Sequence, residues 1–168
     1  MTELKTGQPS IVIRKAVADD APAIVSLLYE SFLEYRALYT VAGYAATAIT
    51  RAEVIDRMRE GPVFVITMDG TIVGTVAIVQ KGDSLYVRGM AVHPSARGRR
   101  IGDRLLTYVE DFAVSHEIGR LFLSTTPFLS RAIRLYERFG FRRIDEGPQD
   151  LFGTPLFTLE KLITGSGQ

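Results

Sequence analysis

The sequence predicts a mixed α/β fold. Short runs of β-branched and aromatic residues, such as residues 85–92, stand among longer runs whose apolar residues repeat at helical spacing, such as residues 101–113. An Asp69-Gly70 pair between two apolar runs is a strong signal for an antiparallel hairpin. The 168 residues are close to the common size of one domain, and no internal repeat divides them. We therefore expect a single domain over residues 1–168, ordered from about 10 to 163.

Capping residues predict the helix boundaries in the first half of the chain. Asp19 or Asp20 caps a first helix, whose apolar residues through Phe32 share one face. Thr50 and Glu53 form a capping box for a second helix, which ends before Gly61-Pro62. The other elements expected here are a strand over 11–16, a loop over 41–48, strands over 63–67 and 71–79, a turn over 81–83 and a strand over 85–92.

The second half continues the alternation of helices and strands. A long amphipathic helix starts at Ile101, and a shorter one is stopped at Gly140. The expected elements are a helix from 101, a strand over 121–125, a helix over 130–139 and strands over 141–145 and 155–162. The predicted order is therefore β-α-α-β-β-β-α-β-α-β-β.

Charge and composition exclude several classes of protein. The chain has 20 Lys and Arg against 19 Asp and Glu, so its net charge implies no bulk attraction to nucleic acid or to a membrane. The absence of cysteine excludes disulfides, a thiol nucleophile and any cysteine-ligated metal, and it fits a reducing compartment. No signal peptide or long apolar run is present, so we expect a soluble cytoplasmic protein with frayed ends at residues 1–9 and 164–168.

The turn over residues 93–100 is basic and leads into a predicted helix. A helix start leaves backbone N–H groups without partners and carries the positive end of the helix dipole, so it favours an anion. Gly98 and Gly102 would let a ligand approach the backbone, and Arg97, Arg99 and Arg100 would add cationic donors. This pattern predicts a pyrophosphate site. The alternative is a solvated basic turn with a capping glycine.

Two segments resemble one known family. The strand, Val-His-Pro and Arg97-Gly98-Arg99-Arg100-Ile101-Gly102 together are similar to the acyl-CoA motif Arg/Gln-x-x-Gly-x-Gly/Ala of the GNAT acetyltransferase superfamily. Residues 132–141 resemble its Ala-x-x-Leu-Tyr-x-x-x-Gly-Phe segment. The chain departs from the family at Arg100, which replaces the middle glycine, and at Leu129, where an asparagine is frequent.

The resemblance implies a mostly antiparallel sheet of six to seven strands flanked by four helices. It also implies a splay between the fourth and fifth strands, where the pantetheine arm of acetyl-CoA, the expected cosubstrate, enters. Backbone N–H groups near Ala91 and Val92 would stabilise the oxyanion, and Met90 and Ala91 would shape the acetyl pocket. The implied cofactor-binding residues are Met90, Ala91, Val92, Arg97, Gly98, Arg99, Arg100, Ile101, Gly102 and Asp103.

Tyr136 is the candidate catalytic residue, because the matching family tyrosine lies near the thioester sulfur. A phenol with a pKa of about 10 can protonate a departing thiolate. The alternative is a core tyrosine with a hydrogen-bonded hydroxyl. His93, followed by proline, is interpreted as a turn residue. The fourth strand offers no carboxylate as general base, which leaves water or the nearby Glu30 and Glu34.

The segment around Glu30, Glu34, Tyr35 and Tyr39 is expected to wall the acceptor site, because carboxylates and aromatic rings suit a cationic amine. The alternative is that the rings pack inward and the charges face water. The loop over 41–48 would close over the substrate.

The resulting hypothesis is an acetyl-CoA-dependent N-acetyltransferase that acts on a primary amine of a small molecule or peptide. The amine would attack directly in a ternary complex, with no metal and no covalent enzyme intermediate. A catalytically silent CoA-binding or regulatory module is the rival hypothesis. A nucleic-acid patch is disfavoured, because no aromatic residues are interleaved with the arginines. A homodimer is compatible with the pattern.

Overall fold

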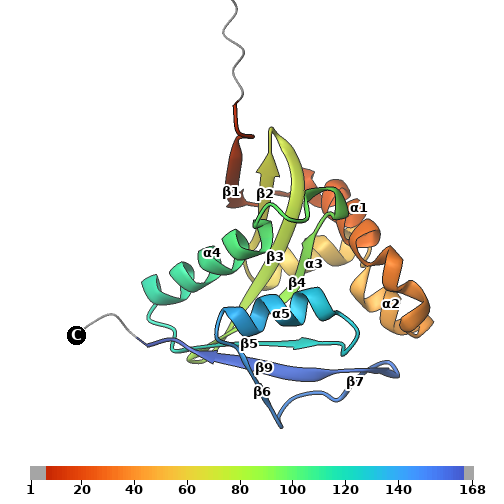
Figure 1. The fold of residues 1–168 in the computed structure, drawn as a ribbon, viewed down its shortest axis with the longest axis vertical. Coiled ribbons are helices and arrows are strands. Elements are labelled where there is room, and N and C mark those ends of the chain that lie inside the picture. The colour runs from red at the N-terminus through yellow and green to blue at the C-terminus, as the bar shows by residue number, and fades with distance from the viewer. Residues whose placement is uncertain (1–6, 165–168) are drawn as a thin grey trace, which may run out of the picture.

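One seven-stranded sheet forms the frame of the protein (Figure 1). The computed structural model describes residues 7–164, so most of the ends predicted to fray lie outside the described residues. The strand order is β1-β2-β3-β4-β5-β9-β6, and all neighbours pair antiparallel except β4 and β5. The strands are β1 (Ile11–Lys15), β2 (Val63–Met68), β3 (Thr71–Lys81), β4 (Ser84–Val92), β5 (Arg120–Thr125), β6 (Arg142–Ile144) and β9 (Phe157–Leu162). The expected mostly antiparallel sheet is confirmed.

The parallel strands β4 and β5 separate after a short contact. Only Ser84–Tyr86 of β4 pair with Arg120–Phe122 of β5, and the remaining residues of the two strands have no partner across this gap. In Figure 1, β4 rises past α5 toward α1, whereas β5 runs across the view below α5. The predicted splay is therefore present, and it opens the middle of the sheet.

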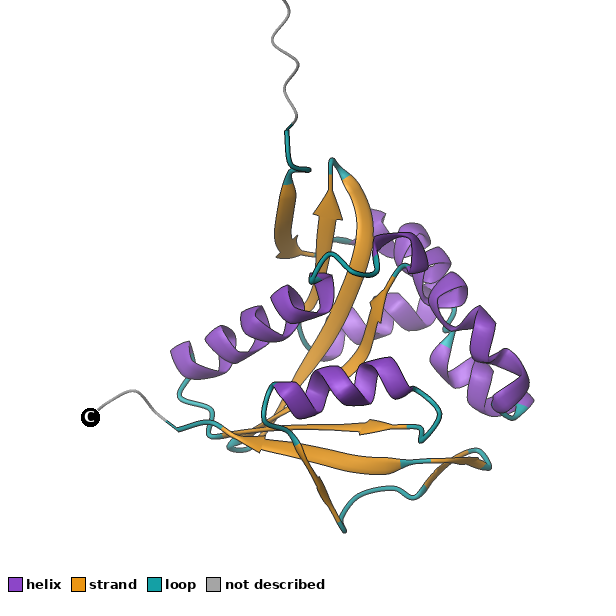
Figure 2. Cartoon of the chain, in the orientation of Figure 1, coloured by secondary structure: helices purple, strands orange, loops and turns teal. Residues whose placement is uncertain are grey.

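Five α-helices, rather than the expected four, flank the sheet within residues 7–164 (Figure 2). They are α1 (Ala21–Phe32), α2 (Val41–Thr47), α3 (Arg51–Glu60), α4 (Ile101–Ser115) and α5 (Ser130–Arg138). The additional helix is α2, so the prediction of a flexible loop over 41–48 was wrong. The Thr40 hydroxyl caps α2 by accepting a hydrogen bond from the Gly43 N–H at 2.9 Å.

Short helical turns and one extra hairpin complete the fold. Single 3-10 turns cover Ala18–Asp20, Leu33–Leu38 and Pro94–Ala96. The small hairpin of β7 (Asp150–Leu151) and β8 (Thr154–Pro155) was not predicted. The capping box of Thr50 and Glu53 is confirmed, and so is the hairpin at Asp69-Gly70, where both residues have positive φ. No helix among the described residues is long and apolar enough to cross a membrane.

Alternating residues of the strands pack into two hydrophobic cores, one on each face of the sheet. Phe64 and Ile66 of β2 pack on the side of α4 and α5, whereas Val63 and Val65 pack on the side of α1 and α3. This alternation follows from the two-residue period of a strand. Because the sheet is covered on both faces, the splay between β4 and β5 connects two layers of the molecule.

Candidate active site

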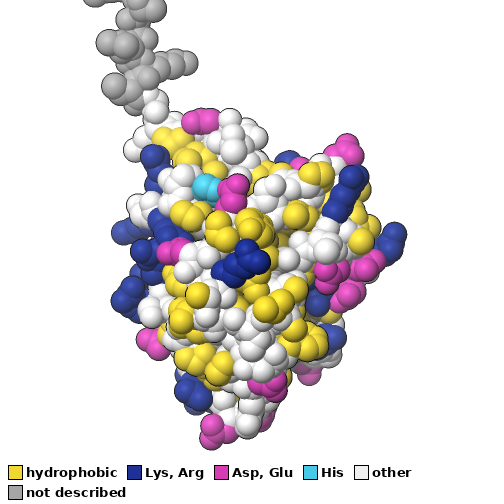
Figure 3. Space-filling view, turned by 90° about the vertical axis from the view of Figure 1, so that its right-hand side faces the viewer, with side chains coloured by type: hydrophobic (Ala, Val, Ile, Leu, Met, Phe, Trp, Pro, Cys, Tyr) yellow, Lys and Arg dark blue, Asp and Glu magenta, His cyan; other side chains and the backbone are white. Residues whose placement is uncertain are grey.

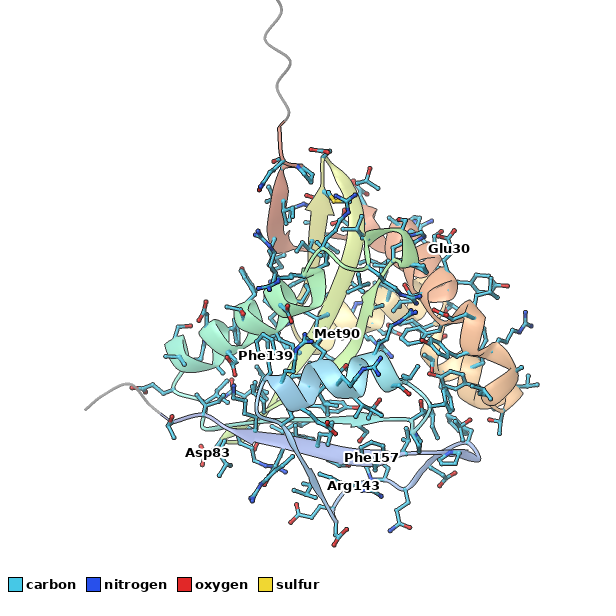
Figure 4. The ribbon with its side chains drawn as sticks, viewed as in Figure 1. Glu30, Asp83, Met90, Phe139, Arg143 and Phe157 are labelled. Carbon is cyan, nitrogen blue, oxygen red and sulfur yellow. The ribbon has the colours of Figure 1, made fainter. Side chains whose placement is uncertain are left out.

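A cavity of about 1150 Å³ lies at the splay. Its walls come from β4, β5, α5, the basic turn before α4 and the segment after α1. On the face that carries α1 and α2, apolar side chains gather around a Lys or Arg side chain (Figure 3). In the view of Figure 4, Met90 lies between α4 and α5. The cavity walls therefore include residues from elements on both faces of the sheet.

A β-bulge shapes the part of β4 that lines this cavity. Ala91 pairs with Thr75 and Arg88 pairs with Ala77, so Gly89 and Met90 have no partner in the ladder with β3. Gly89 has a φ of 61°, a left-handed conformation that favours glycine. Both unpaired residues line the cavity. The bulge therefore places two residues without a cross-strand partner at the cavity wall.

The ladder also identifies a donor near the end of β4. The His93 N–H donates to the Val73 carbonyl at 2.8 Å, so by alternation Ala91 is directed toward β3 and Val92 toward the open side. The Val92 carbonyl accepts from the Ser31 hydroxyl at 3.3 Å, which leaves the Val92 N–H as the candidate donor to a ligand. Of the two residues expected at the oxyanion, the geometry favours Val92 over Ala91.

The basic turn enters α4 through a residue with an uncommon backbone conformation. Arg100 is the N-cap of α4 and has φ 58° and ψ 29°, in the left-handed region. Its side chain makes no capping hydrogen bond and lines the cavity. The family's preference for glycine at this position is explained by this conformation, which costs an L-residue about 1–2 kcal/mol.

We expect Arg100→Gly to stabilise the fold and to weaken cofactor binding. The relief of backbone strain exceeds the glycine entropy cost of about 0.4–1 kcal/mol, so the melting temperature should rise by about 2 °C. The KM for acetyl-CoA should rise, because a cation is removed from the turn. Thermal unfolding and steady-state kinetics measure the two effects. Arg99→Gly is the control: it removes the same charge at a position without positive φ, so a similar gain in stability there would contradict the explanation.

The two glycines of the motif have different roles. Gly98, with a φ of 80°, faces open space, as a site for ligand oxygens requires. A Cβ at Gly102 would lie 2.7 Å from the Leu135 side chain and 3.4 Å from Met90. Gly102 therefore allows α4 to approach α5, and packing explains it at least as well as ligand access.

The side chains of the turn divide into those that line the cavity and those that do not. Arg97 and Arg100 line it, and so do Arg131 and Arg138 of α5. Arg99 does not. Of the ten expected cofactor-binding residues, nine line the cavity: Met90, Ala91, Val92, Arg97, Gly98, Arg100, Ile101, Gly102 and Asp103.

The cationic donors of the turn are partly neutralised by carboxylates. Arg97 forms an ion pair with Glu34, and Arg131 Nη1 lies 4.0 Å from the same carboxylate. Arg138 Nη2 lies 2.9 Å from Asp103 Oδ1. Glu34 is therefore a competitor for the cations that an anionic ligand would use.

We expect Glu34→Gln to lower the KM for acetyl-CoA about two- to fivefold. An ion pair of this exposure contributes about 0.2–1 kcal/mol, and its loss frees Arg97 for the phosphates. Kinetics at low and high salt measure the effect, which should shrink as salt screens the charges. Glu137→Gln removes a charge of α5 outside the cavity and should leave this KM unchanged. A rise in KM in the Glu34 variant would contradict the competition.

Tyr136 lies in the cavity wall, as expected for the candidate acid. Its side chain is 7% exposed and its ring packs 5.8 Å from the ring of Phe141. Burial, with a smaller contribution from Tyr39, raises the pKa of Tyr136 to about 12. Tyr136 also belongs to the buried cluster on the side of α4 and α5, as the alternative of a core tyrosine predicts. The phenol keeps its proton at neutral pH.

The expected acceptor residues are only partly brought together. Tyr35 and Tyr39 line the cavity, and Phe128 packs between their rings at centroid distances of 6.2 and 4.8 Å. Glu30 and Glu34 do not line it. In Figure 4, Glu30 lies on α1, well apart from Met90. Its carboxylate contacts His93 Nε2 at 2.6 Å.

The geometry of His93 agrees with its interpretation as a turn residue. The Ser95 N–H donates to His93 Nδ1 at 3.1 Å, and His93 caps the turn over Pro94–Ala96. With Nδ1 accepting, Nε2 carries the hydrogen and donates to Glu30. His93 is outside the cavity lining.

Four arginines of the cavity lining were missed by the sequence analysis, and two of them are Arg131 and Arg138 of α5. The other two are Arg57 of α3 and Arg88 of β4. The Arg57 side chain lies beside Gly89, and Arg88 precedes Gly89 in the sequence. An isolated glycine inside a strand pattern is a known sign of a bulge, so Gly89 was the signal that could have drawn attention to its neighbours. Arg57 had no such signal, because a helix pattern does not show which surface a charge faces.

The splayed sheet, the bulge and the basic turn together define a domain of the N-acyltransferase class. Residues 24–141 match the model of the acetyltransferase (GNAT) family. Because this match covers more than half of the sequence, the chain belongs to the GNAT acetyltransferase family, which confirms the resemblance of the two motifs.

Individual proteins support this assignment. The chain is similar to an IAA acetyltransferase of Azospirillum brasilense, with 40% identity over 86 residues, which are 50% of this chain and 55% of that protein. It is 29% identical over 143 residues to the uncharacterized N-acetyltransferase YjgM of Escherichia coli, covering 81% of this chain and 84% of the relative. The solved structure of PaiA N-acetyltransferase from Thermoplasma acidophilum in complex with coenzyme A has the same fold, with a TM-score of 0.78, 18% identity and coverage of 91% and 99%.

The alignment with the Azospirillum protein spans only about half of that protein's length. The family assignment rests on the match over residues 24–141, and the name of this relative does not identify the acceptor of this chain.

Proposed function

We propose that the protein transfers the acetyl group of acetyl-CoA to a primary amine of a small molecule or peptide, by direct attack in a ternary complex. The observation that carries this proposal is one cavity that contains the protonated phenol of Tyr136, the bulge of β4 and the cations of the turn before α4. These are the groups that acid catalysis, oxyanion stabilisation and phosphate binding require.

The residues of the cavity fit acetyl-CoA. The turn cations Arg97 and Arg100 suit its pyrophosphate, and Gly98 leaves space beside the backbone at the start of α4. The gap between β4 and β5 suits its pantetheine arm, as the unpaired strand edges offer N–H and C=O groups. When bound, acetyl-CoA supplies the acetyl group as an activated thioester. Met90, Ala91 and Val92 would contact its acetyl end.

The chain's residues would act on the two protons of the reaction. The amine nitrogen forms a bond with the acetyl carbon while the carbon–sulfur bond breaks. Tyr136 would donate its hydroxyl proton to the leaving sulfur and then regain a proton from water, and the Val92 N–H would donate a hydrogen bond to the acetyl oxygen. The attacking amine must lose a proton, and Asp103, the one carboxylate that the described residues contribute to the cavity wall, is engaged by Arg138. We therefore assign this proton to water.

Binding and turnover can be measured separately. Saturating acetyl-CoA, at about 100 times its Kd, should add about 2.7 kcal/mol and raise the melting temperature by several degrees. Arg97→Glu should remove most of this shift, whereas Lys81→Glu, a charge reversal outside the cavity, should retain it. Thiol release with a panel of amines then tests transfer. The absence of any shift with the wild-type protein would refute the cosubstrate.

Within the described part of the chain, the cavity lining has no carboxylate free of an ion pair, which favours a second candidate, a silent CoA-binding or regulatory module. That module would show the thermal shift but no thiol release with any amine. Cytoplasmic location, a single domain over residues 1–168 and a homodimer are further proposals. The first agrees with the absence of cysteine.

A further inference from the structure

Two arginine residues outside the basic turn, one on α3 and one on β4, lie beside the bulge of β4. Arg57 reaches over from α3, and its Nη1 lies so close to Gly89 that a Cβ there would be 2.4 Å from it. Arg88 is the neighbouring residue on β4. Both line the cavity. The Arg57 guanidinium is thus placed next to Gly89 in the bulge, and Arg88 is the residue before it.

These cations are incompletely neutralised. Among residues 7–164, no carboxylate lies within 4.0 Å of the Arg57 guanidinium. Arg88 Nη2 donates to Glu60 Oε2 at 2.5 Å, but its Nε is buried without a hydrogen-bond partner. One exposed carboxylate therefore faces two guanidinium groups, with Glu53 acting on Arg57 from farther away.

The arrangement is costly unless a ligand completes it. Burial, and then repulsion by Arg88, lower the pKa of Arg57. A partly buried cation without a carboxylate partner and a buried N–H without an acceptor each destabilise the fold. A carboxylate satisfies both, because its two oxygens accept several guanidinium hydrogen bonds at once. Among residues 7–164 the cavity lining has one carboxylate, that of Asp103 on α4, and it pairs with Arg138.

We infer that Arg57 and Arg88 form a carboxylate-binding subsite, and that the acceptor is a small amino acid-like molecule whose carboxylate lies next to its amino group. This inference rests on the acetyl transfer proposed above. Since Arg57 touches the bulge, an anion bound there holds a neighbouring amine close to the backbone that faces the acetyl group. A carboxylate more distant from the amine would place the nitrogen away from the bulge.

The inference reverses the charge expected of the acceptor. Glu30 and Glu34 suggested a cationic amine, but both are outside the cavity lining. Glu30 pairs with His93, and Glu34 pairs with Arg97. The charges at the cavity wall beside the bulge are positive. A polyamine would meet repulsion there, whereas an amino acid brings the missing negative charge.

The test compares amino acids with their carboxamides, which differ only in this charge. Thiol release is measured with the twenty amino acids, their amides and aliphatic polyamines. For the preferred side chain, kcat/KM should be at least tenfold higher for the acid than for the amide. Arg57→Gln should raise the KM for the amino acid at least tenfold, with kcat and the KM for acetyl-CoA little changed. Arg57→Lys should restore part of the loss.

Arg51→Gln removes a charge from the same helix outside the cavity and should behave as wild type. Melting curves establish that each variant folds, and Arg88→Gln gives a second, independent variant. Equal activity on acid and amide, or a rise only in the KM for acetyl-CoA, would overturn the subsite.

A binding experiment separates this inference from the proposed function. N-acetyl amino acids and their amides are titrated calorimetrically into the protein saturated with CoA. Binding that requires the carboxylate and is lost in Arg57→Gln supports the subsite even if no amine releases thiol, in which case only the transfer fails. Thiol release with amines but no discrimination by charge leaves the transfer standing and refutes the subsite. The absence of binding by any of these ligands also refutes it.

Discussion

Tyr136→Phe should lower kcat about 10²- to 10⁴-fold while leaving the KM values for acetyl-CoA and acceptor nearly unchanged. The substitution keeps the ring, and therefore its packing on Phe141, but removes the only proton that this side chain can donate. The hydroxyl lies in the cavity wall and its raised pKa keeps it protonated at working pH. Steady-state thiol release under saturating substrates measures kcat. An unchanged kcat would remove Tyr136 from the mechanism.

Tyr108→Phe is the matched control, because its ring packs on Phe64 outside the cavity and its loss of a hydroxyl should not affect kcat. The alkaline stability of the Tyr136 variant provides a second readout. A phenol with a folded-state pKa of about 12 stabilises the fold fully below its ordinary value near 10 and loses this contribution as the pH rises through 12. The wild type should therefore lose about 3 kcal/mol between pH 10 and 12 that the variant does not lose.

Most of the frame could be predicted from local signals. The hairpin at Asp69-Gly70 and the capping box of Thr50 depend on neighbouring residues, so the sequence alone is sufficient to place them. α2 was missed because its residues, small and without strong apolar spacing, resemble a loop. Its cap at Thr40 also bonds to Thr154 and Phe152, more than 100 positions later in the chain, and no local pattern shows such contacts.

The candidate site shows the same division. The motif residues Arg97, Gly98 and Tyr136 line the cavity as expected, because the two motifs that resemble the family contain all three of them. Arg57 and Arg88 come from elements whose approach depends on the tertiary fold. Gly61, whose added Cβ would lie 2.1 Å from the Ile78 carbonyl, shows how closely the end of α3 packs against β3. That contact helps to position Arg57, and charge patterning cannot reveal it.

Gly89→Ala should lower kcat about 10²-fold and also raise the KM for the acceptor. The left-handed φ of 61° penalises any side chain, and the new Cβ would lie 2.4 Å from Arg57 Nη1. If the strand relieves this strain by losing the bulge, the Val92 N–H changes direction. The removal of one such donor costs about 10²–10³ in kcat in a well-studied protease. The displaced Arg57 accounts for the change in KM.

Gly82→Ala separates the strain from its functional consequence. Gly82 has a φ of 60° in the turn between β3 and β4, with nothing within 4 Å of an added Cβ. An alanine at this position therefore has the same backbone penalty, but outside the cavity lining. Both variants should lose about 1 kcal/mol of stability, or about 2–4 °C in melting temperature. Only Gly89→Ala should lose activity. Wild-type kcat in a folded Gly89→Ala protein would mean that the bulge is a packing feature of the sheet, and the donor role of β4 would then have no support from its geometry.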